Sequence, residues 1–162
     1  ILYNVPSRTG CAIAPETVAR LVKNVEYIVG IKEASGNISQ ICQIASYIGD
    51  GFDMYSGNDD QTVPLMSLGG IGCISTVSNI IPGRFANMTR DFLNGNYIQA
   101  GKEQVAIKPL IDSLFVEVNP VPVKAALNMM RMCNLEYRLP MCPPSNKTQY
   151  MVYDALEEFG LI

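Results

Sequence analysis

Lys32, Tyr3 and Arg8 have side chains that could do chemistry, and two of them end apolar runs of the sequence. Lys32 closes the run Tyr27–Lys32, and Tyr3 lies near the end of Ile1–Val5. Such strand ends are where α/β enzymes place reactive groups. A lysine there loses solvent, which disfavours its charged form, and a neutral amine can attack a carbonyl to form a Schiff base. A phenol can carry protons, and the planar fork of an arginine suits a carboxylate.

Each of these side chains also has a structural explanation. Lys32 could solvate a strand end, Tyr3 could belong to the core, and Arg8 could form a surface ion pair. Three nearby acids are expected to be solvated or to cap helices: Glu33, Asp59 and Asp60.

Composition excludes several other kinds of chemistry. The sequence contains 0 histidines, so it has no Ser-His-Asp relay, no Cys-His pair and no imidazole zinc site. Its 5 cysteines form no C-x-x-C pair, which predicts reduced, buried thiols and a cytoplasmic protein. A net charge of -3 argues against a nucleic-acid partner, and no apolar run is long enough to predict a membrane span.

The elements that would position these residues alternate along the chain. Four short apolar runs predict strands: Ile1–Val5, Tyr27–Lys32, Phe52–Tyr55 and Ile71–Ser75. Segments with helical spacing follow each run, which indicates a parallel sheet under helices, either open or part of a (β/α)₈ barrel. No glycine-rich nucleotide motif follows any run. From Tyr97 onward the strand signals stop, and helices are expected, one of them over residues 119–134.

Six segments taken together resemble the dihydrodipicolinate synthase family. They are Leu-Tyr-Asn-Val-Pro-Ser-Arg-Thr-Gly (2–10), Gly-Ile-Lys-Glu-Ala-Ser-Gly-Asn (30–37), Ser-Gly-Asn-Asp (56–59), Gly-Cys-Ile-Ser-Thr-Val-Ser-Asn (72–79), Asn-Pro-Val-Pro-Val-Lys (119–124) and Arg-Leu-Pro (138–140). The resemblance runs the whole length of the chain, in order.

The resemblance implies an enzyme that forms an imine with its substrate. It implies α/β architecture, with residues 1–95 as strands 5–8, the second half of a (β/α)₈ TIM barrel, and residues 96–162 as a C-terminal helical domain. Lys32 would hold pyruvate as a covalent imine with no separate cofactor, and Tyr3 would relay protons. Arg8 would bind the carboxylate of aspartate semialdehyde. Gly57 and the backbone of Ile74 would line the pyruvate site, and no metal is expected.

The resemblance also implies missing parts and partners. The family's first four β/α units are absent, and with them the threonine and the second tyrosine of the proton path and most of a lysine-feedback site. The sequence opens in mid-strand, which suggests a fragment. We therefore expect the N-terminal half of the barrel as a partner, and a homo-oligomer, a dimer of dimers.

Two rival functions remain open from the sequence. N-acetylneuraminate lyase and ketodeoxy-sugar aldolases of the same superfamily share the tyrosine and the lysine. Arg8 favours an acidic semialdehyde over a sugar chain. A rival of another class is a non-catalytic half-barrel that serves as an assembly partner.

Overall fold

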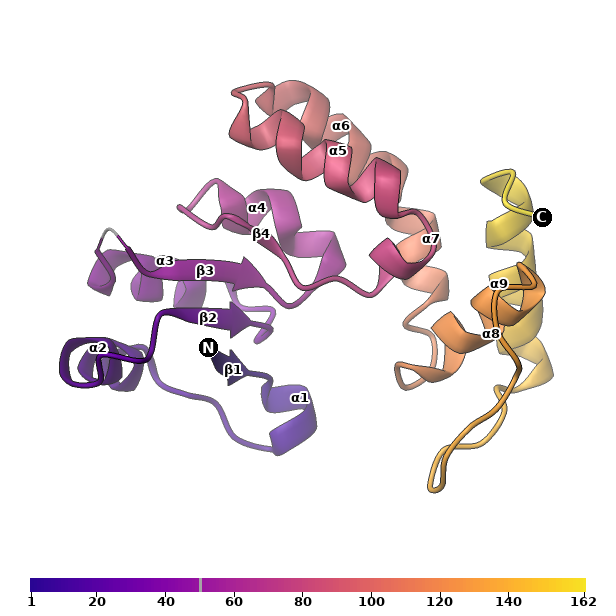
Figure 1. Cartoon of the computed structure of the whole chain (residues 1–162), viewed down its shortest axis with the longest axis horizontal. Coiled ribbons are helices and arrows are strands. Elements are labelled where there is room, and N and C mark those ends of the chain that lie inside the picture. Colours follow the sequence, from indigo (N-terminus) through magenta and orange to yellow (C-terminus); the bar gives the residue numbers. More distant parts are fainter. Residues whose placement is uncertain (50) are drawn as a thin grey trace. The chain divides into compact units, whose positions relative to one another are not determined.

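Four short parallel strands form one sheet, as the apolar runs predict. The computed structural model describes residues 1–49 and 51–162. The strands are β1 (Leu2–Asn4), β2 (Gly30–Glu33), β3 (Asp53–Ser56) and β4 (Gly72–Cys73), in the order β1-β2-β3-β4 (Figure 1). Each strand pairs in parallel with the next one along the chain, so the predicted mixed α/β fold with a parallel sheet is confirmed.

Helices follow the strands and then continue alone to the C-terminus. The α-helices are α1 (Pro6–Thr9), α2 (Pro15–Asn24), α3 (Ile38–Tyr47), α4 (Thr62–Met66), α5 (Pro82–Leu93), α6 (Tyr97–Ala106), α7 (Lys108–Ser113), α8 (Val121–Met129) and α9 (Asn146–Glu158). Two 3₁₀ turns, Asp59–Gln61 and Val77–Asn79, precede α4 and α5. No described helix is long and apolar enough to cross a membrane.

Local sequence explains where the first helices begin. Pro15 occupies the first turn of α2, where its missing N–H costs nothing. The side chain of Asn37 accepts hydrogen bonds from the N–H groups of Ser39 and Gln40 and so caps α3. Pro64 lies in the first turn of α4, and therefore does not break it.

The sheet buries one face against helices. A cluster of buried side chains from β2, β3, α2, α3 and α4 forms this core: Val18, Ile31, Ile41, Ile44, Met54 and Leu65. Ile31 and Met54 are register partners and both are fully buried. Because side chains alternate along a strand, the next residues, Lys32 and Tyr55, point to the opposite face. The core therefore fixes which face of the sheet carries the lysine.

The chain divides into two compact units. The first comprises residues 1–75 and 89–101, and the second comprises residues 76–88 and 102–162. This division follows local packing and does not test the predicted boundary between residues 95 and 96, which stays a prediction. The sheet and every candidate site residue belong to the first unit.

The second unit is helical, as expected, but one helix is shorter than predicted. The expected helix over residues 119–134 is α8, which ends at Met129. Arg131 adopts a left-handed φ of 59°, and its N–H donates to the carbonyl of Asn128, so the helical ladder stops there.

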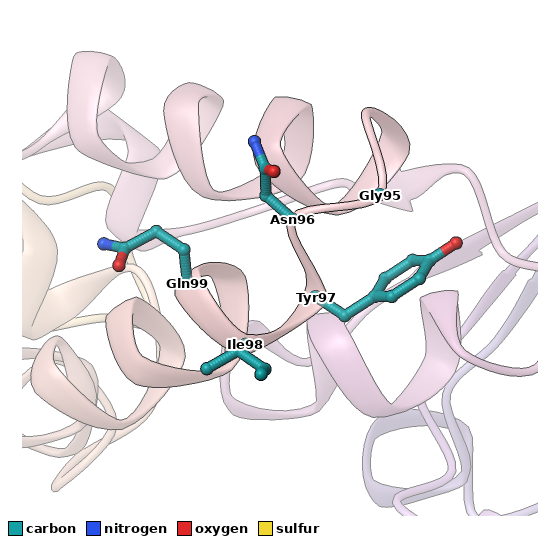
Figure 2. Close-up of a pocket in the computed structure, with 5 residues that line it drawn as sticks. All are labelled: Gly95, Asn96, Tyr97, Ile98 and Gln99. Carbon is teal, nitrogen blue, oxygen red and sulfur yellow. The ribbon is translucent and has the colours of Figure 1, made fainter.

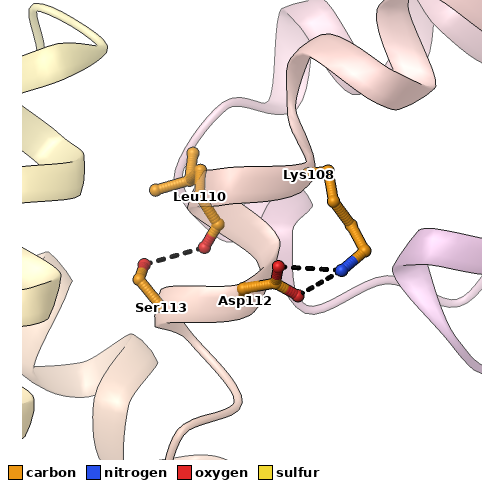
Figure 3. Close-up of polar contacts among 4 residues, drawn as sticks. All are labelled: Lys108, Leu110, Asp112 and Ser113. Atoms are coloured by element: carbon orange, nitrogen blue, oxygen red, sulfur yellow. Dashed lines mark hydrogen bonds and ion pairs between the residues drawn. The ribbon is translucent and has the colours of Figure 1, made fainter.

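Several polar side chains of the second unit hydrogen-bond to one another or to the backbone. In α7 the ammonium of Lys108 lies 2.6 Å from a carboxylate oxygen of Asp112, one turn away, and the Ser113 hydroxyl donates to the Leu110 carbonyl (Figure 3). The half-buried Glu117 carboxylate accepts hydrogen bonds from Thr148 and Ser145, which lower the pKa of this carboxyl. These contacts secure helix ends and offer no group for catalysis.

Candidate active site

A lysine and a tyrosine lie together on the open face of the sheet. Tyr3 of β1 is the register partner of Lys32 in β2, and Tyr55 of β3 is the partner of Lys32 on the other side. The Nζ atom of Lys32 lies 4.3 Å from the centre of the Tyr3 ring. Lys32 and Tyr55 are half-buried, and Tyr3 is 49% exposed. An amine and a phenol on neighbouring strand ends are thus in direct contact, an arrangement that suits imine formation with proton transfer.

A buried polar pair lies on the other face, one residue further along each strand. The Asn4 amide donates to Oε2 of Glu33 at 2.7 Å, and both residues are 1% exposed. The N–H of Ser35 donates to Oε1 of Glu33 at 2.7 Å, and the N–H of Ile13 donates to Oδ1 of Asn4 at 2.9 Å. Glu33 is therefore not the solvated or capping acid that the sequence suggested. Alternation along β2 turns its side chain toward the helices, where Asn4 satisfies it.

Gly57 and Ile74 follow directly after β3 and β4, at the same edge of the sheet as Lys32. The N–H of Gly57 donates to the Glu33 carbonyl at 2.7 Å, and a Cβ added at Gly57 would lie 2.5 Å from the Cβ of Ala34. Only glycine fits this close approach. The N–H of Ile74 donates to the Ser56 carbonyl at 2.9 Å, and the Ile74 side chain is 43% exposed. Both backbones therefore border the strand ends, while their role in pyruvate binding stays a prediction.

Arg8 is placed by a helix that the sequence did not predict. α1 begins at Pro6, directly after β1, and ends at Gly10, whose φ of 71° closes it. Proline at the start and glycine at the end were a readable signal. Arg8 is exposed on this helix. The structure thus brings Tyr3 and Lys32 into contact and places Arg8 on the segment that follows β1.

A second buried acid, Asp59, lies in the 3₁₀ turn that follows β3. Asp59 is 2% exposed, so it is not a solvated acid, whereas Asp60 is exposed; both lie in the first turn of the 3₁₀ segment Asp59–Gln61. The Cys73 thiol lies 3.8 Å from Oδ1 of Asp59. Burial, followed by the negative charge of Asp59, raises the pKa of the Cys73 thiol to about 12, although Thr62 and Lys32 act in the opposite direction. Cys73 is therefore a protonated thiol and not a nucleophile.

The remaining cysteines and one hollow of the surface belong to other elements of the described chain. Four cysteines are exposed, contrary to the expected buried thiols: Cys11, Cys42, Cys133 and Cys142. A hollow of about 510 Å³ surrounds the turn between α5 and α6, where Tyr97, Ile98 and Gln99 project outward (Figure 2). In the described part of the chain, no group of three or more Cys, Asp or Glu side chains could hold a metal ion.

A model of the dihydrodipicolinate synthetase family matches residues 1–159. The chain belongs to this family. It is 46% identical over 162 residues to the 4-hydroxy-tetrahydrodipicolinate synthase of Thermoanaerobacter sp. (strain X514), with 100% of this chain and 54% of that protein covered. It is 43% identical over 162 residues to the enzyme of the same name from Nitratidesulfovibrio vulgaris (strain DP4), with 100% of this chain and 56% of that protein covered.

Solved structures of the dihydrodipicolinate synthetase family superpose closely on this fold. The crystal structure of dihydrodipicolinate synthase from Thermotoga maritima matches with a TM-score of 0.96 and 42% identity, covering 99% of this chain and 55% of that one. The enzyme from Cyanidioschyzon merolae, solved with lysine bound, matches with a TM-score of 0.95 and 36% identity, covering 99% of this chain and 54% of that one. The chain therefore spans about half the length of its relatives and corresponds to a half-barrel plus helices. We call this chain joined to the family's N-terminal half the complete barrel.

Tyr55 and the Asn4–Glu33 pair are the site residues that sequence reasoning missed. Tyr55 lies in the same register row as Tyr3 and Lys32. Aligning the predicted strand ends with one another, instead of examining each alone, would have placed Tyr55 beside Lys32. The same alignment pairs Asn4 with Glu33, one residue beyond Tyr3 and Lys32, but it does not show that the two side chains are buried and hydrogen-bonded.

Cys73 should resist alkylation in the folded complete barrel at about pH 8, while the four exposed cysteines react. A pKa of about 12 leaves almost no thiolate, and the thiolate is the reactive form. The thiol has a pKa of 9.0 when unfolded, so its stabilising contribution is present below pH 9.0 and is lost as the pH rises toward 12. Peptide mapping after iodoacetamide treatment checks this, with urea-unfolded protein as the control. Labelling of Cys73 as fast as Cys42 in the folded protein would contradict it.

Proposed function

We propose that the complete barrel is a lyase that condenses pyruvate with L-aspartate 4-semialdehyde in lysine and diaminopimelate biosynthesis. The observation that carries this proposal is the contact between the Lys32 amine and the Tyr3 ring, 4.3 Å from its centre. The names of the relatives and the family match support the same reaction. The catalytic groups proposed in this chain are Lys32 and Tyr3.

Lys32 is the proposed nucleophile of a class I, Schiff-base mechanism. Its neutral amine attacks the ketone carbon of pyruvate, and loss of one water gives an imine. The imine withdraws electrons from the neighbouring methyl group, so a proton can leave and the resulting enamine carbon can attack an aldehyde. Tyr3, against the amine, is suited to pass the protons that these steps release and consume. The covalent imine does the work of a cofactor, and none other is proposed.

Backbone and guanidinium groups are proposed to bind the two substrates. Gly57 and the backbone of Ile74 border the strand end beside Lys32 and are proposed to line the pyruvate site. Arg8, exposed on α1 after β1, is proposed to hold the semialdehyde carboxylate. The partners proposed are the N-terminal half of the barrel and further copies of the subunit in a homotetramer, a dimer of dimers. The proposed location is the cytoplasm, with no nucleic-acid or membrane partner.

Arg8→Ala in the complete barrel should raise the KM for aspartate semialdehyde about tenfold to a hundredfold. A hydrogen-bonded charge pair contributes about 1.5–3 kcal/mol, and its loss removes binding of this substrate alone. Borohydride trapping of pyruvate should stay unchanged, because imine formation does not involve this carboxylate. Steady-state kinetics with both substrates and mass spectrometry of the trapped protein measure the two effects.

The matched control is Arg20→Ala, which removes an exposed arginine from a different helix, α2. It should leave both measurements unchanged. Turnover of N-acetylneuraminate, or of a ketodeoxy sugar, in preference to aspartate semialdehyde would instead favour the sugar lyases of the superfamily. Failure of the complete barrel to trap pyruvate at all would favour the non-catalytic assembly role.

A further inference from the structure

The buried Asn4–Glu33 pair joins the two strands that carry the candidate catalytic groups. Asn4 directly follows Tyr3, Glu33 directly follows Lys32, and the two are register partners. Their side chains meet at 2.7 Å on the face opposite the amine and the phenol. A backbone hydrogen bond from the N–H of Ala34 to the Asn4 carbonyl, at 2.8 Å, joins the same two strand ends.

Each hydrogen bond of this pair has a defined donor and a defined acceptor. Glu33 accepts from the Asn4 amide through Oε2 and from the Ser35 N–H through Oε1. Asn4 accepts from the Ile13 N–H through Oδ1. The donor side of Asn4 thus faces a carboxylate, and its acceptor side faces a backbone N–H. Both residues are 1% exposed, so water cannot replace a lost partner without opening the structure.

This arrangement fixes the relative height of β1 and β2 at the row next to Tyr3 and Lys32. A slip or tilt of either strand would break at least one buried hydrogen bond. Proton transfer and attack on a carbonyl both depend steeply on distance and orientation. The separation of 4.3 Å between the Lys32 amine and the Tyr3 ring centre therefore depends on the Asn4–Glu33 hydrogen bond on the opposite face of the sheet.

We propose that Glu33 and Asn4 are positioning residues for imine formation: they hold Lys32 against Tyr3 through strand register and do not touch the substrate. This proposal builds on the function proposed for Lys32. Tyr3 carries the phenol proposed to transfer protons. Glu33 helps to position Tyr3 because it binds Asn4, the next residue of β1.

A swap of hydrogen-bonding groups tests this pair. Glu33→Gln alone turns an amide N–H₂ toward the amide N–H₂ of Asn4, while its single remaining oxygen still accepts from the N–H of Ser35. Asn4→Asp alone sets two carboxylates against each other. The double variant, Asn4→Asp with Glu33→Gln, restores an N–H donor facing a carboxylate and keeps an acceptor for both Ser35 and Ile13. The double variant therefore rebuilds the pair with its polarity reversed.

The expected result in the complete barrel is a rate of pyruvate trapping by borohydride that falls about tenfold or more in each single variant. The double variant should return to within about threefold of the unchanged protein. The effect should fall on kcat more than on the KM for pyruvate. The control is Glu16→Gln, which alters an exposed glutamate that accepts one hydrogen bond from Gln43, and it should change nothing.

A second measurement reports on position without any reaction. After reductive ¹³C-methylation, the dimethylamine signal of Lys32, assigned with Lys32→Arg, should be shifted upfield by the ring current of Tyr3. The single variants should lose this shift and the double variant should regain it. Unchanged shift and unchanged trapping in folded single variants would overturn the positioning role.

The outcomes separate this inference from the proposed function. If the unchanged protein traps no pyruvate, the proposed function fails, and the ring-current shift still decides whether the pair positions Lys32. If the single variants do not fold, the double variant carries the test. A folded double variant with the shift restored supports the pair, and one without the shift overturns it.

Discussion

Lys32→Ala should abolish the trapping of pyruvate by borohydride in the complete barrel, and this is the largest effect expected of any single substitution. Imine formation needs an amine next to a proton carrier, and Lys32 is the lysine that ends a strand of the sheet against a phenol. The chain has five other lysines, all on described helices: Lys23, Lys102, Lys108, Lys124 and Lys147. None of these helical positions ends a strand, so none can replace Lys32.

The measurement is the intact mass after incubation with pyruvate and borohydride, followed by peptide mapping. The unchanged protein should gain one reduced pyruvate on Lys32, and the variant should gain none above background. Lys23→Ala, which removes an exposed lysine from the last turn of α2, is the matched control and should trap fully. Trapping in Lys32→Ala that maps to another lysine of this chain would remove Lys32 from the mechanism.

The sequence was informative where local pattern decides the structure. Apolar runs bounded by turn residues predicted the four strands, and spacing predicted α2 and α3. A strand end is a local feature, so Tyr3 and Lys32 could be placed at one edge of a parallel sheet before their contact was known. The prediction erred by a few residues at strand boundaries and missed α1, because a single turn between Pro6 and Gly10 has no periodicity to detect.

Burial of charge could not be predicted in the same way. Glu33 and Asp59 looked like solvated or capping acids because each stands among polar neighbours in sequence. The partner that buries Glu33 is Asn4, 29 residues earlier, and the neighbour of Asp59 is Cys73, 14 residues later. Whether an acid is buried depends on such a distant partner, since an unpaired buried carboxylate is too costly to keep. The cysteines were mispredicted in the opposite direction. They were expected to be buried because they are small and apolar, but four of them are exposed.

The second large effect expected is instability of the 162-residue chain on its own, and its cause is the exposed face and edges of the sheet. Alternation puts Ile1 and Ile74 on the same face as Tyr3, and these side chains are 66%, 43% and 49% exposed. β1 pairs only with β2, and β4 only with β3, among the described strands. Each outer edge therefore presents backbone N–H and C=O groups without a neighbouring strand.

The isolated chain should therefore not be a stable monomer. An open strand edge bonds to water in the monomer, but it is a template for pairing with another chain, and an exposed apolar face favours association in the same way. A whole domain is stable by only about 5–15 kcal/mol, so apolar burial lost from this face removes a large part of that margin. We expect the chain to aggregate, to pair with a second copy, or to require the N-terminal half, and to have little synthase activity by itself.

Light scattering and calorimetry of the isolated chain, with and without the separately expressed N-terminal half, measure this. Adding the N-terminal half should convert aggregates into a defined complex with a cooperative melt. Ile1→Lys should weaken that complex because it places a charge on the open face, whereas Ile98→Lys, on the exposed side of α6, should not. A monomer of 17.7 kDa that melts cooperatively would refute the stability claim. Substantial turnover of pyruvate with aspartate semialdehyde by that monomer would show that four strands suffice for the proton path, and the threonine and second tyrosine of the other half would then be dispensable.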